Sequence, residues 1–148
     1  MRGSAWPIVV ATCATLAACV DDQQALQTSD PIYTMVFFAT DSVALNKRAR
    51  DQLSYTVNNP TPPIAAALQP ESKAKICVTG HTDKVGSEAV NKDVAQRRAD
   101  AVAKYLVELG VPQQRVVTAS LGSSKPLVVT APGTSEIANR RVEVVFGC

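Results

Sequence analysis

The chain of 148 residues contains a single histidine, His81, which excludes a metal site built on several imidazoles. Its carboxylates form no cluster that would suggest a metal site of oxygen ligands. No two of its four cysteines have the two-residue gap typical of zinc knuckles and thioredoxin-like centres. The net charge of +2, from 15 Lys and Arg against 13 Asp and Glu, is too small to favour nucleic acid as a partner.

The sequence also has no apolar run long enough to cross a bilayer. The longest run, Ala5 to Val20, is shorter than the ~20 residues that a spanning helix needs. It follows the basic Arg2 and ends in small residues, the pattern of a secretory signal. Residues 16–19, Leu-Ala-Ala-Cys, resemble the lipobox of bacterial lipoproteins. We therefore predict a lipoprotein signal peptide over residues 1–18 and a diacylglycerol on Cys19; an ordinary cleaved signal with an incidental cysteine is the alternative.

The remainder of the chain divides into a short polar segment and one domain. Residues 19–31 have no apolar period and are interpreted as a lipidated N-terminus and flexible tether. Val20, rather than aspartate, follows the cysteine; by resemblance to Gram-negative lipoproteins, this favours the outer membrane, with the domain facing the periplasm. Residues 32–148 form the domain, and the apolar content of 46% is sufficient for a packed core.

Hydrophobic periodicity and helix-capping signals place two helices among four strands. A helix from Lys47 to about Val57 follows the capping residue Asn46, and a long helix runs from Glu88 or Lys92 to Leu109. Strands are expected at Tyr33–Phe38, Lys75–Thr79, Arg115–Leu121 and Arg141–Phe146. The order β-α-β-α-β-β predicts an α+β fold, a four-stranded mixed sheet covered by helices on one face.

Three polar clusters occur along this pattern. Thr79-Gly80-His81-Thr82-Asp83 is followed by Gly86-Ser87, then by Asn91 and Arg98, and near the end by Asn139-Arg140-Arg141. With Tyr105-Leu106, Gly110-Val111 and Lys125-Pro126, these residues resemble the OmpA-like peptidoglycan-binding domain family, of the peptidoglycan-associated lipoprotein type. The resemblance runs in one continuous order from about Val36 to Phe146. It implies the fold of OmpA C-terminal domains, noncovalent binding of peptidoglycan, and neither cofactor nor catalysis.

The spacing of the polar residues predicts a cavity for a zwitterion. Asp83 follows the tip of a strand, and Asn91 and Arg98 are seven residues apart, so they share one helix face. A carboxylate and a guanidinium suit a ligand that carries an ammonium and a carboxylate. The resemblance implies meso-diaminopimelate of the wall stem peptide, with Asp83 on its ammonium, Arg98 on its carboxylate, and further contacts from Asn91, Arg140, Thr40 and Asp41. A stabilising salt bridge between Asp83 and Arg98 is the alternative.

The pairing of Cys77 and Cys148 remains open at this point. The oxidising periplasm permits a disulfide, and antiparallel neighbouring strands would bring the two residues together. Strand parity opposes the bridge, because Cys148 continues the face of Val144 and Phe146. A possible disulfide between Cys77 and Cys148 is therefore one of two alternatives.

The leading hypothesis is a non-enzymatic lipoprotein that links the outer membrane, through its lipid anchor, to peptidoglycan. The alternative is an interaction module that docks on envelope proteins of a secretion or motility complex, with an apolar surface around Ile64 to Leu68 as its cue. An enzyme is disfavoured. Along a strand, His81 would lie roughly 13 Å from the Cys77 thiol, and no second histidine could complete a catalytic relay.

Overall fold

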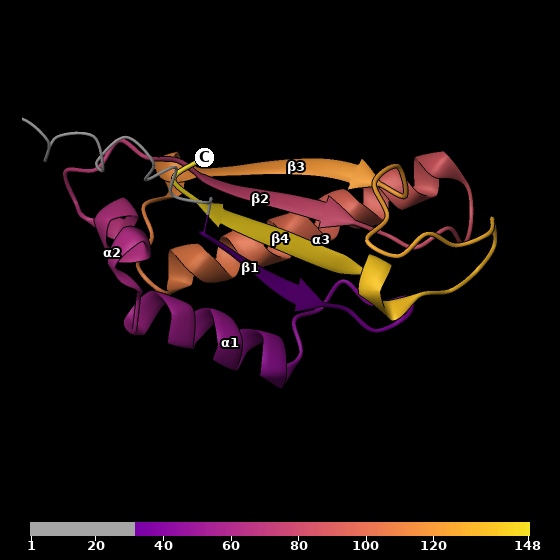
Figure 1. The fold of residues 1–148 in the computed structure, drawn as a ribbon, viewed down its shortest axis with the longest axis horizontal. Helices are drawn as coiled ribbons and strands as arrows, with labels where there is room; N and C mark the ends of the chain where they lie inside the picture. Colours follow the sequence, from indigo (N-terminus) through magenta and orange to yellow (C-terminus); the bar gives the residue numbers. More distant parts are fainter. Residues whose placement is uncertain (1–31) are drawn as a thin grey trace, which may run out of the picture.

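The computed structural model describes residues 32–148, so the predicted signal peptide, Cys19 and the tether lie outside the described residues. Four strands form one sheet in the order β1-β4-β2-β3 (Figure 1). β4 (Arg141–Phe146) is antiparallel to β1 (Ile32–Phe37) and to β2 (Ile76–His81), whereas β2 is parallel to β3 (Val116–Gly122). The predicted α+β fold with a mixed sheet is confirmed.

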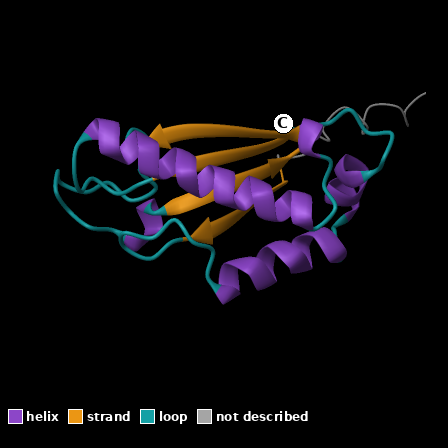
Figure 2. Cartoon of the chain, turned by 180° about the vertical axis from the view of Figure 1, so that it is seen from behind, coloured by secondary structure: helices purple, strands orange, loops and turns teal. Residues whose placement is uncertain are grey.

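The helices cover one face of the sheet (Figure 2). α3 (Glu88–Glu108) packs on β2 and β3, α1 (Lys47–Asn58) packs beside β1, and the short α2 (Pro62–Leu68) lies near β4. The core lies between these layers and is built from the inward-facing residues of the strands, among them Val36, Val78, Val142 and Val144. None of the helices in residues 32–148 combines the length and apolar character needed to cross a membrane.

A capping side chain marks the start of each long helix. The Asn46 side chain accepts a hydrogen bond from the Ala49 backbone N–H at 2.8 Å, and α1 begins at the next residue, Lys47. The Ser87 hydroxyl accepts one from the Val90 N–H, so α3 takes the earlier of the two predicted starts, Glu88. After α3, the positive φ of 100° at Gly110 turns the chain towards β3.

The contact between α3 and β2 is closer than the sequence pattern indicates. A Cβ added to Gly80 would lie 1.9 Å from the carbonyl oxygen of Ala95, so only glycine fits at this position. Ala95 and Ala99 are consequently the most deeply buried residues of this stretch of α3, together with Arg98. Small side chains on the helix and none on the strand bring the two backbones together.

Residues 64–68 do not form the exposed apolar surface that was expected as a docking cue. They belong to α2, where Ile64 and Ala67 are buried in the core. Two prolines at the start of α2 fix backbone angles suited to the first helical turn, and the apolar residues that follow then face inward. The apolar surface expected around Ile64 to Leu68 as a docking cue is therefore wrong.

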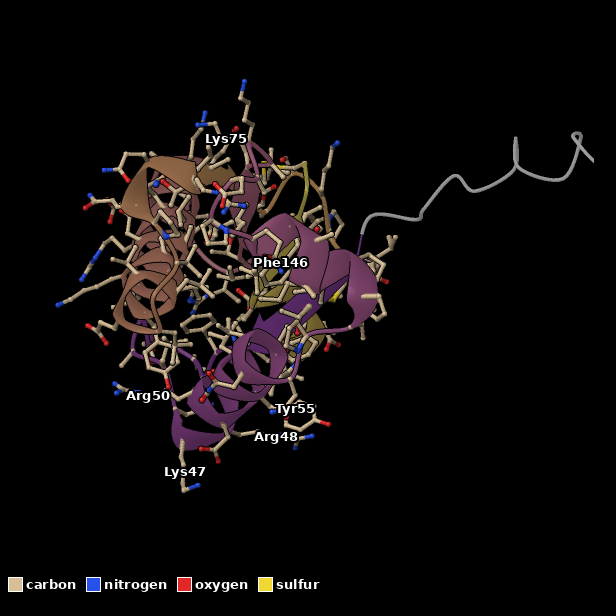
Figure 3. The ribbon with its side chains drawn as sticks, turned by 90° about the vertical axis from the view of Figure 1, so that its left-hand side faces the viewer. Lys47, Arg48, Arg50, Tyr55, Lys75 and Phe146 are labelled. Atoms are coloured by element: carbon tan, nitrogen blue, oxygen red, sulfur yellow. A yellow bond between two sulfur atoms is a disulfide. The ribbon has the colours of Figure 1, made fainter. Side chains whose placement is uncertain are left out.

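Cys77 and Cys148 form a disulfide at the end of the sheet where β1 begins, with 6.0 Å between their Cα atoms. The parity argument against the bridge does not apply, because β4 ends at Phe146 and Gly147 adopts a φ of +84°. This turn is held by hydrogen bonds from the Gly147 and Cys148 N–H groups to the Lys75 carbonyl. Figure 3 views the domain from this end, where Lys75 and Phe146 are labelled.

The close approach of β2 and α3 predicts that Gly80→Ala lowers the free energy of unfolding by more than about 2 kcal/mol, because the helix backbone must move away. Urea unfolding followed by circular dichroism measures the change. Gly133→Ala is the matched control: Gly133 has a φ of +78° but open space around it, so only a strain of about 1 kcal/mol is expected. Equal costs for the two variants would contradict the packing argument.

Candidate ligand-binding cleft

A cleft of about 310 Å³ opens at the end of the sheet where β1 and β2 finish and where β4 and α3 begin. We call it the polar cleft. It brings together all six residues that the sequence analysis selected: Thr40, Asp41, Asp83, Asn91, Arg98 and Arg140. It is also lined by residues that the sequence analysis did not select, including the polar Thr82, Arg97 and Ser135 and the apolar Val43, Val85, Val90 and Val94.

The guanidinium of Arg98 is almost completely buried, with 2% of the residue exposed. It is held by backbone carbonyls: Nε donates to Ser42 O at 2.9 Å, Nη1 to His81 O at 3.4 Å and Nη2 to Ala39 O at 3.3 Å. It also lies 5.2 Å from the centre of the Phe38 ring. Three of its five N–H groups are used in this way, so one on each terminal nitrogen remains for a ligand.

Within residues 32–148, no carboxylate forms an ion pair with Arg98. Burial and the nearby charge of Arg140 lower the pKa of Arg98, but a guanidinium remains protonated in proteins. The polar cleft therefore contains a fixed positive charge that no carboxylate of the described residues contacts. Such a charge favours an anionic ligand group.

Asp83 supplies the buried negative charge of the polar cleft, whereas Asp41 is exposed at its rim. Its Oδ2 accepts three hydrogen bonds, from Arg140 Nη1 at 2.8 Å, from the Ser135 hydroxyl at 3.2 Å and from the Glu136 N–H at 3.2 Å. Its Oδ1 accepts only a long bond of 3.4 Å from the Val85 N–H. One oxygen is thus used to hold the carboxylate in place, and the other retains capacity for a ligand cation.

The charge state of Asp83 follows from this environment. Burial alone would raise the pKa of Asp83, but the hydrogen bonds from Arg140, Glu136, Val85 and Ser135 together lower it below its usual value. The carboxylate is therefore ionised at neutral pH.

The salt bridge in the polar cleft joins Asp83 to Arg140, and the alternative that paired Asp83 with Arg98 is wrong. Arg140 Nη1 also donates to the Ser135 hydroxyl at 2.8 Å, and its Nε donates to Phe38 O at 3.3 Å. The side chain selected as a ligand contact thus orients the acid, while Arg98 keeps its free donors.

The other selected residues form the wall and the rim of the polar cleft. Asn91 is buried in the first turn of α3, on the same helix face as Arg98. Thr40 and Asp41 are exposed in the turn after β1, where Asp41 adopts a left-handed φ of 52°. The buried Thr82 hydroxyl, by contrast, was missed: it lines the polar cleft and has no hydrogen-bond partner among the described residues. The sequence signal that could have identified Thr82 is its position next to Asp83 in the motif Thr79-Gly80-His81-Thr82-Asp83.

His81 lies immediately before Thr82, and its side chain is 2% exposed. Neither ring nitrogen has a hydrogen bond within the described chain, and Nε2 lies 3.7 Å from a carboxylate oxygen of Glu143. That carboxylate is already bound by Arg141, at 2.6 Å. Burial first, and then the charge of Arg141, lower the pKa of His81. The folded protein therefore keeps this imidazole neutral.

Comparison with known proteins identifies the family. The model of the OmpA family matches residues 37–140. The chain belongs to the OmpA family. In agreement with the sequence analysis, membership makes it a non-enzymatic OmpA-like domain.

Curated relatives of the OmpA-like domain include lipoproteins of several bacteria. The peptidoglycan-associated lipoprotein of Buchnera aphidicola is 39% identical over 56% of this chain and 48% of its own length. The outer-membrane lipoprotein YfiB of Pseudomonas aeruginosa is 32% identical over 73% of this chain and 64% of its own length. The peptidoglycan-binding protein ArfA of Mycobacterium tuberculosis is 38% identical over 55% of this chain but only 25% of its own. The chain thus covers between a quarter and two thirds of the length of each of these relatives.

Solved structures agree with this assignment of the fold. The crystal structure of the peptidoglycan-associated lipoprotein from Burkholderia pseudomallei has a TM-score of 0.63 and 27% identity, covering 75% of this chain and 87% of that one. The C-terminal domain of MotB from Helicobacter pylori has a TM-score of 0.58 and 27% identity, covering 78% and 81%.

The neutral His81 predicts how stability depends on pH between 7 and 5. Its ordinary pKa is 6.5 and its folded pKa is lower, so its stabilising contribution is complete above pH 6.5 and is lost as the pH falls through the folded value. The contribution of Asp83 is lost only below its ordinary value of 3.8. The wild type should therefore lose more unfolding free energy than His81→Gln over this range, as measured by urea unfolding. If the unfolding free energies of the two proteins fell equally between pH 7 and 5, His81 would not be the group responsible for the loss.

Proposed function

We propose that the protein binds peptidoglycan noncovalently through the diaminopimelate of the stem peptide and so tethers the outer membrane to the cell wall. The observation that carries the proposal is that the two charged groups in the polar cleft keep hydrogen-bonding capacity for a ligand. Asp83 Oδ1 and two N–H groups of Arg98 are available, and both residues line the same volume of about 310 Å³. An ammonium and a carboxylate on one carbon centre fit such a pair.

In this proposal, each part of the ligand meets a group of matching chemistry. The ammonium lies on Asp83 Oδ1, and the carboxylate receives both free N–H groups of Arg98. The Asn91 amide and the unpartnered Thr82 hydroxyl provide neutral hydrogen bonds at the buried wall. Thr40 and Asp41 contact the ligand from the rim, the valines pack against its methylene chain, and Arg140 acts by holding Asp83.

The arrangement of the domain suits a tether. β1 begins at Ile32, paired with Phe146, and ends at Phe37, paired with Arg141 beside the polar cleft. Six strand residues extend about 20 Å, so the chain enters the domain at the end opposite to the cleft. A lipid on Cys19, at the start of the flexible tether over residues 19–31, would thus be attached to the end of the domain opposite to the polar cleft and leave the polar cleft free to reach the wall.

The names of the relatives support the same location. Three of those compared are called peptidoglycan-associated or outer-membrane lipoproteins, and we place this protein with them as an outer-membrane lipoprotein facing the periplasm. Its signal peptide would then comprise residues 1–18. Because anchor and wall are held in one thin compartment, even a weak single site would keep them associated.

The test uses the ligand and the protein separately. In calorimetry, the wild-type protein should bind a stem peptide that contains diaminopimelate. It should bind the same peptide with lysine in that position, which lacks the second carboxylate, at least about tenfold more weakly, because a charge-assisted hydrogen bond contributes ~1.5–3 kcal/mol. This comparison involves no variant and therefore no effect on folding. Equal affinity for both peptides would contradict the role of Arg98.

On the protein side, Asp83→Asn keeps the shape of the side chain and removes its charge. It should reduce retention on purified sacculi by about tenfold or more, because the ligand ammonium loses its counter-charge. Asp100→Asn, an equivalent change on an exposed residue of α3 outside the polar cleft, is the matched control and should be retained like wild type. Full retention of Asp83→Asn on the sacculi would contradict the proposal.

A further inference from the structure

The sheet has two edges, and the structure treats them differently. At the β1 edge, the Gln52 side chain of α1 donates hydrogen bonds of 2.9 Å to the Thr34 hydroxyl and to the Met35 carbonyl. At the β3 edge, the Gln96 amide donates to the Thr118 hydroxyl at 3.1 Å, but no side chain of residues 32–148 bonds to the backbone of Val116 to Ser120, and this strand pairs only with β2. β3 therefore presents an open row of backbone donors and acceptors.

The first five residues of β3 have none of the usual protections of an exposed edge. Natural edge strands are commonly blunted by charged side chains, by proline or by a bulge. β3 reads Val-Val-Thr-Ala-Ser-Leu-Gly, without charge or proline. Its register shift lies at the far end, where Ser120 pairs with Gly80 and Gly122 with His81. The five residues before the shift remain regular and suited to pairing.

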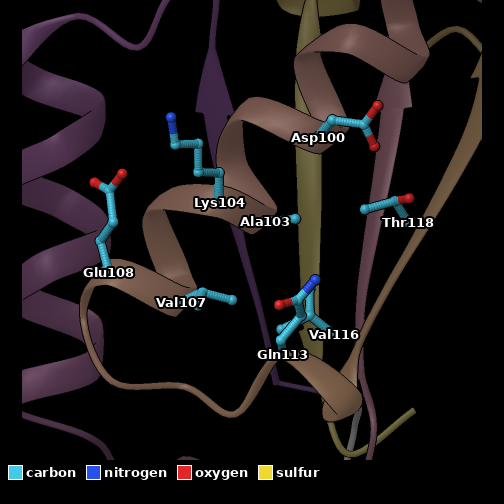
Figure 4. Close-up of a pocket in the computed structure, with 8 residues that line it drawn as sticks. All are labelled: Asp100, Ala103, Lys104, Val107, Glu108, Gln113, Val116 and Thr118. Carbon is cyan, nitrogen blue, oxygen red and sulfur yellow. The ribbon is translucent and has the colours of Figure 1, made fainter.

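A groove of about 520 Å³ lies along this edge, between β3 and the second half of α3. We call it the edge groove. Val116 and Thr118 line it from the strand, and Ala103 and Val107 line it from the helix (Figure 4). It continues the helix-covered side of the sheet, and the inward-facing side chains of a fifth strand would occupy this position.

The edge groove has one charged group directed towards β3. Figure 4 shows Asp100 pointing towards Thr118, whereas Lys104 and Glu108 point away from the strand. The Asp100 carboxylate accepts a hydrogen bond of 2.8 Å from the Gln96 amide, and no cationic side chain of the described residues pairs with it. The edge groove thus has an acid without a cationic partner at one end, an apolar part formed by Ala103, Val107 and Val116, and the charged Lys104 and Glu108 on the side away from β3.

We propose that the β3 edge binds an extended segment of a partner protein as a fifth strand. One inward side chain of the segment is Lys or Arg and pairs with Asp100. The inward side chain two residues away is aliphatic and fills the space between Ala103, Val107 and Val116. The spacing agrees: two strand residues span about 6.6 Å, and along α3 the midpoint of positions 103 and 107 lies about 7.5 Å from position 100.

A second copy of this chain is a poorer occupant, because of its charge. If two β3 edges paired, each would offer the other only valine, threonine, alanine and serine, with no cation for Asp100. A partner segment that carries a Lys or Arg supplies the cation that Asp100 would otherwise lack. The proposal concerns a surface separate from the polar cleft and does not depend on wall binding.

Selection of random 12-residue peptides on the full chain tests the proposal, because it leaves the partner sequence free. We expect the selected peptides to contain Lys or Arg two residues from Val, Ile or Leu. They should bind at least tenfold more weakly to Asp100→Lys. N-methylation of the backbone at alternate residues, which removes donors without changing side chains, should abolish binding of those peptides in which the methylated N–H groups face β3.

Two matched controls show whether the loss of binding comes from the charge at position 100. Asp93→Lys, the same substitution on an exposed acid of α3 that does not line the edge groove, should bind the peptides within twofold of wild type, and so should the cleft variant Asp83→Asn. Circular dichroism of Asp100→Lys checks that the exposed substitution leaves the fold intact. The proposal is overturned if no peptide is selected, if the peptides tolerate Asp100→Lys or every pattern of N-methylation, or if the chain dimerises through β3.

Discussion

The chemistry of this domain depends on a buried guanidinium with which no carboxylate of residues 32–148 forms an ion pair. Transfer of a charge out of water costs several kcal/mol unless polar groups replace the lost hydration. For Arg98, that replacement comes from the carbonyls of Ala39, Ser42 and His81 and from the face of the Phe38 ring. Carbonyl dipoles hold the cation without cancelling its charge, so its attraction for an anion is preserved.

This constraint also explains why the fold and the polar cleft cannot be separated. The three carbonyls come from the loop after β1 and from the last residue of β2, two strands that lie on either side of β4. Arg98 itself is placed by α3, whose distance from the sheet is set by the absence of a side chain at Gly80. The residue immediately before β4, Arg140, then holds Asp83. Four elements must therefore pack correctly before the acid and the base face the same volume.

The sequence predicted what is local and missed what depends on distant contacts. The capping residue Asn46 predicted the start of α1, and a spacing of seven placed Asn91 and Arg98 on one face, whereas the start of α3 was left between Glu88 and Lys92. The Arg140–Asp83 pair joins positions 57 residues apart, and the Ser135 bond to Asp83 spans 52, so no local pattern contains either. The disulfide was left open because parity applies to a regular strand, whereas Gly147 turns the chain after β4 has ended.

The distribution of charge on α3 shows how one helix serves two surfaces. From its first turn to its middle, α3 presents Asn91 and Arg98 to the polar cleft; further along, it presents Asp100, Ala103 and Val107 to the edge groove. Arg98 and Asp100 are two residues apart, which on a helix means different faces, so the buried cation and the exposed acid do not neutralise each other. Because the same helix carries both, a shift of α3 on the sheet would alter the polar cleft and the edge groove together. The tight contact at Gly80 and Ala95 opposes that shift and keeps the two surfaces independent.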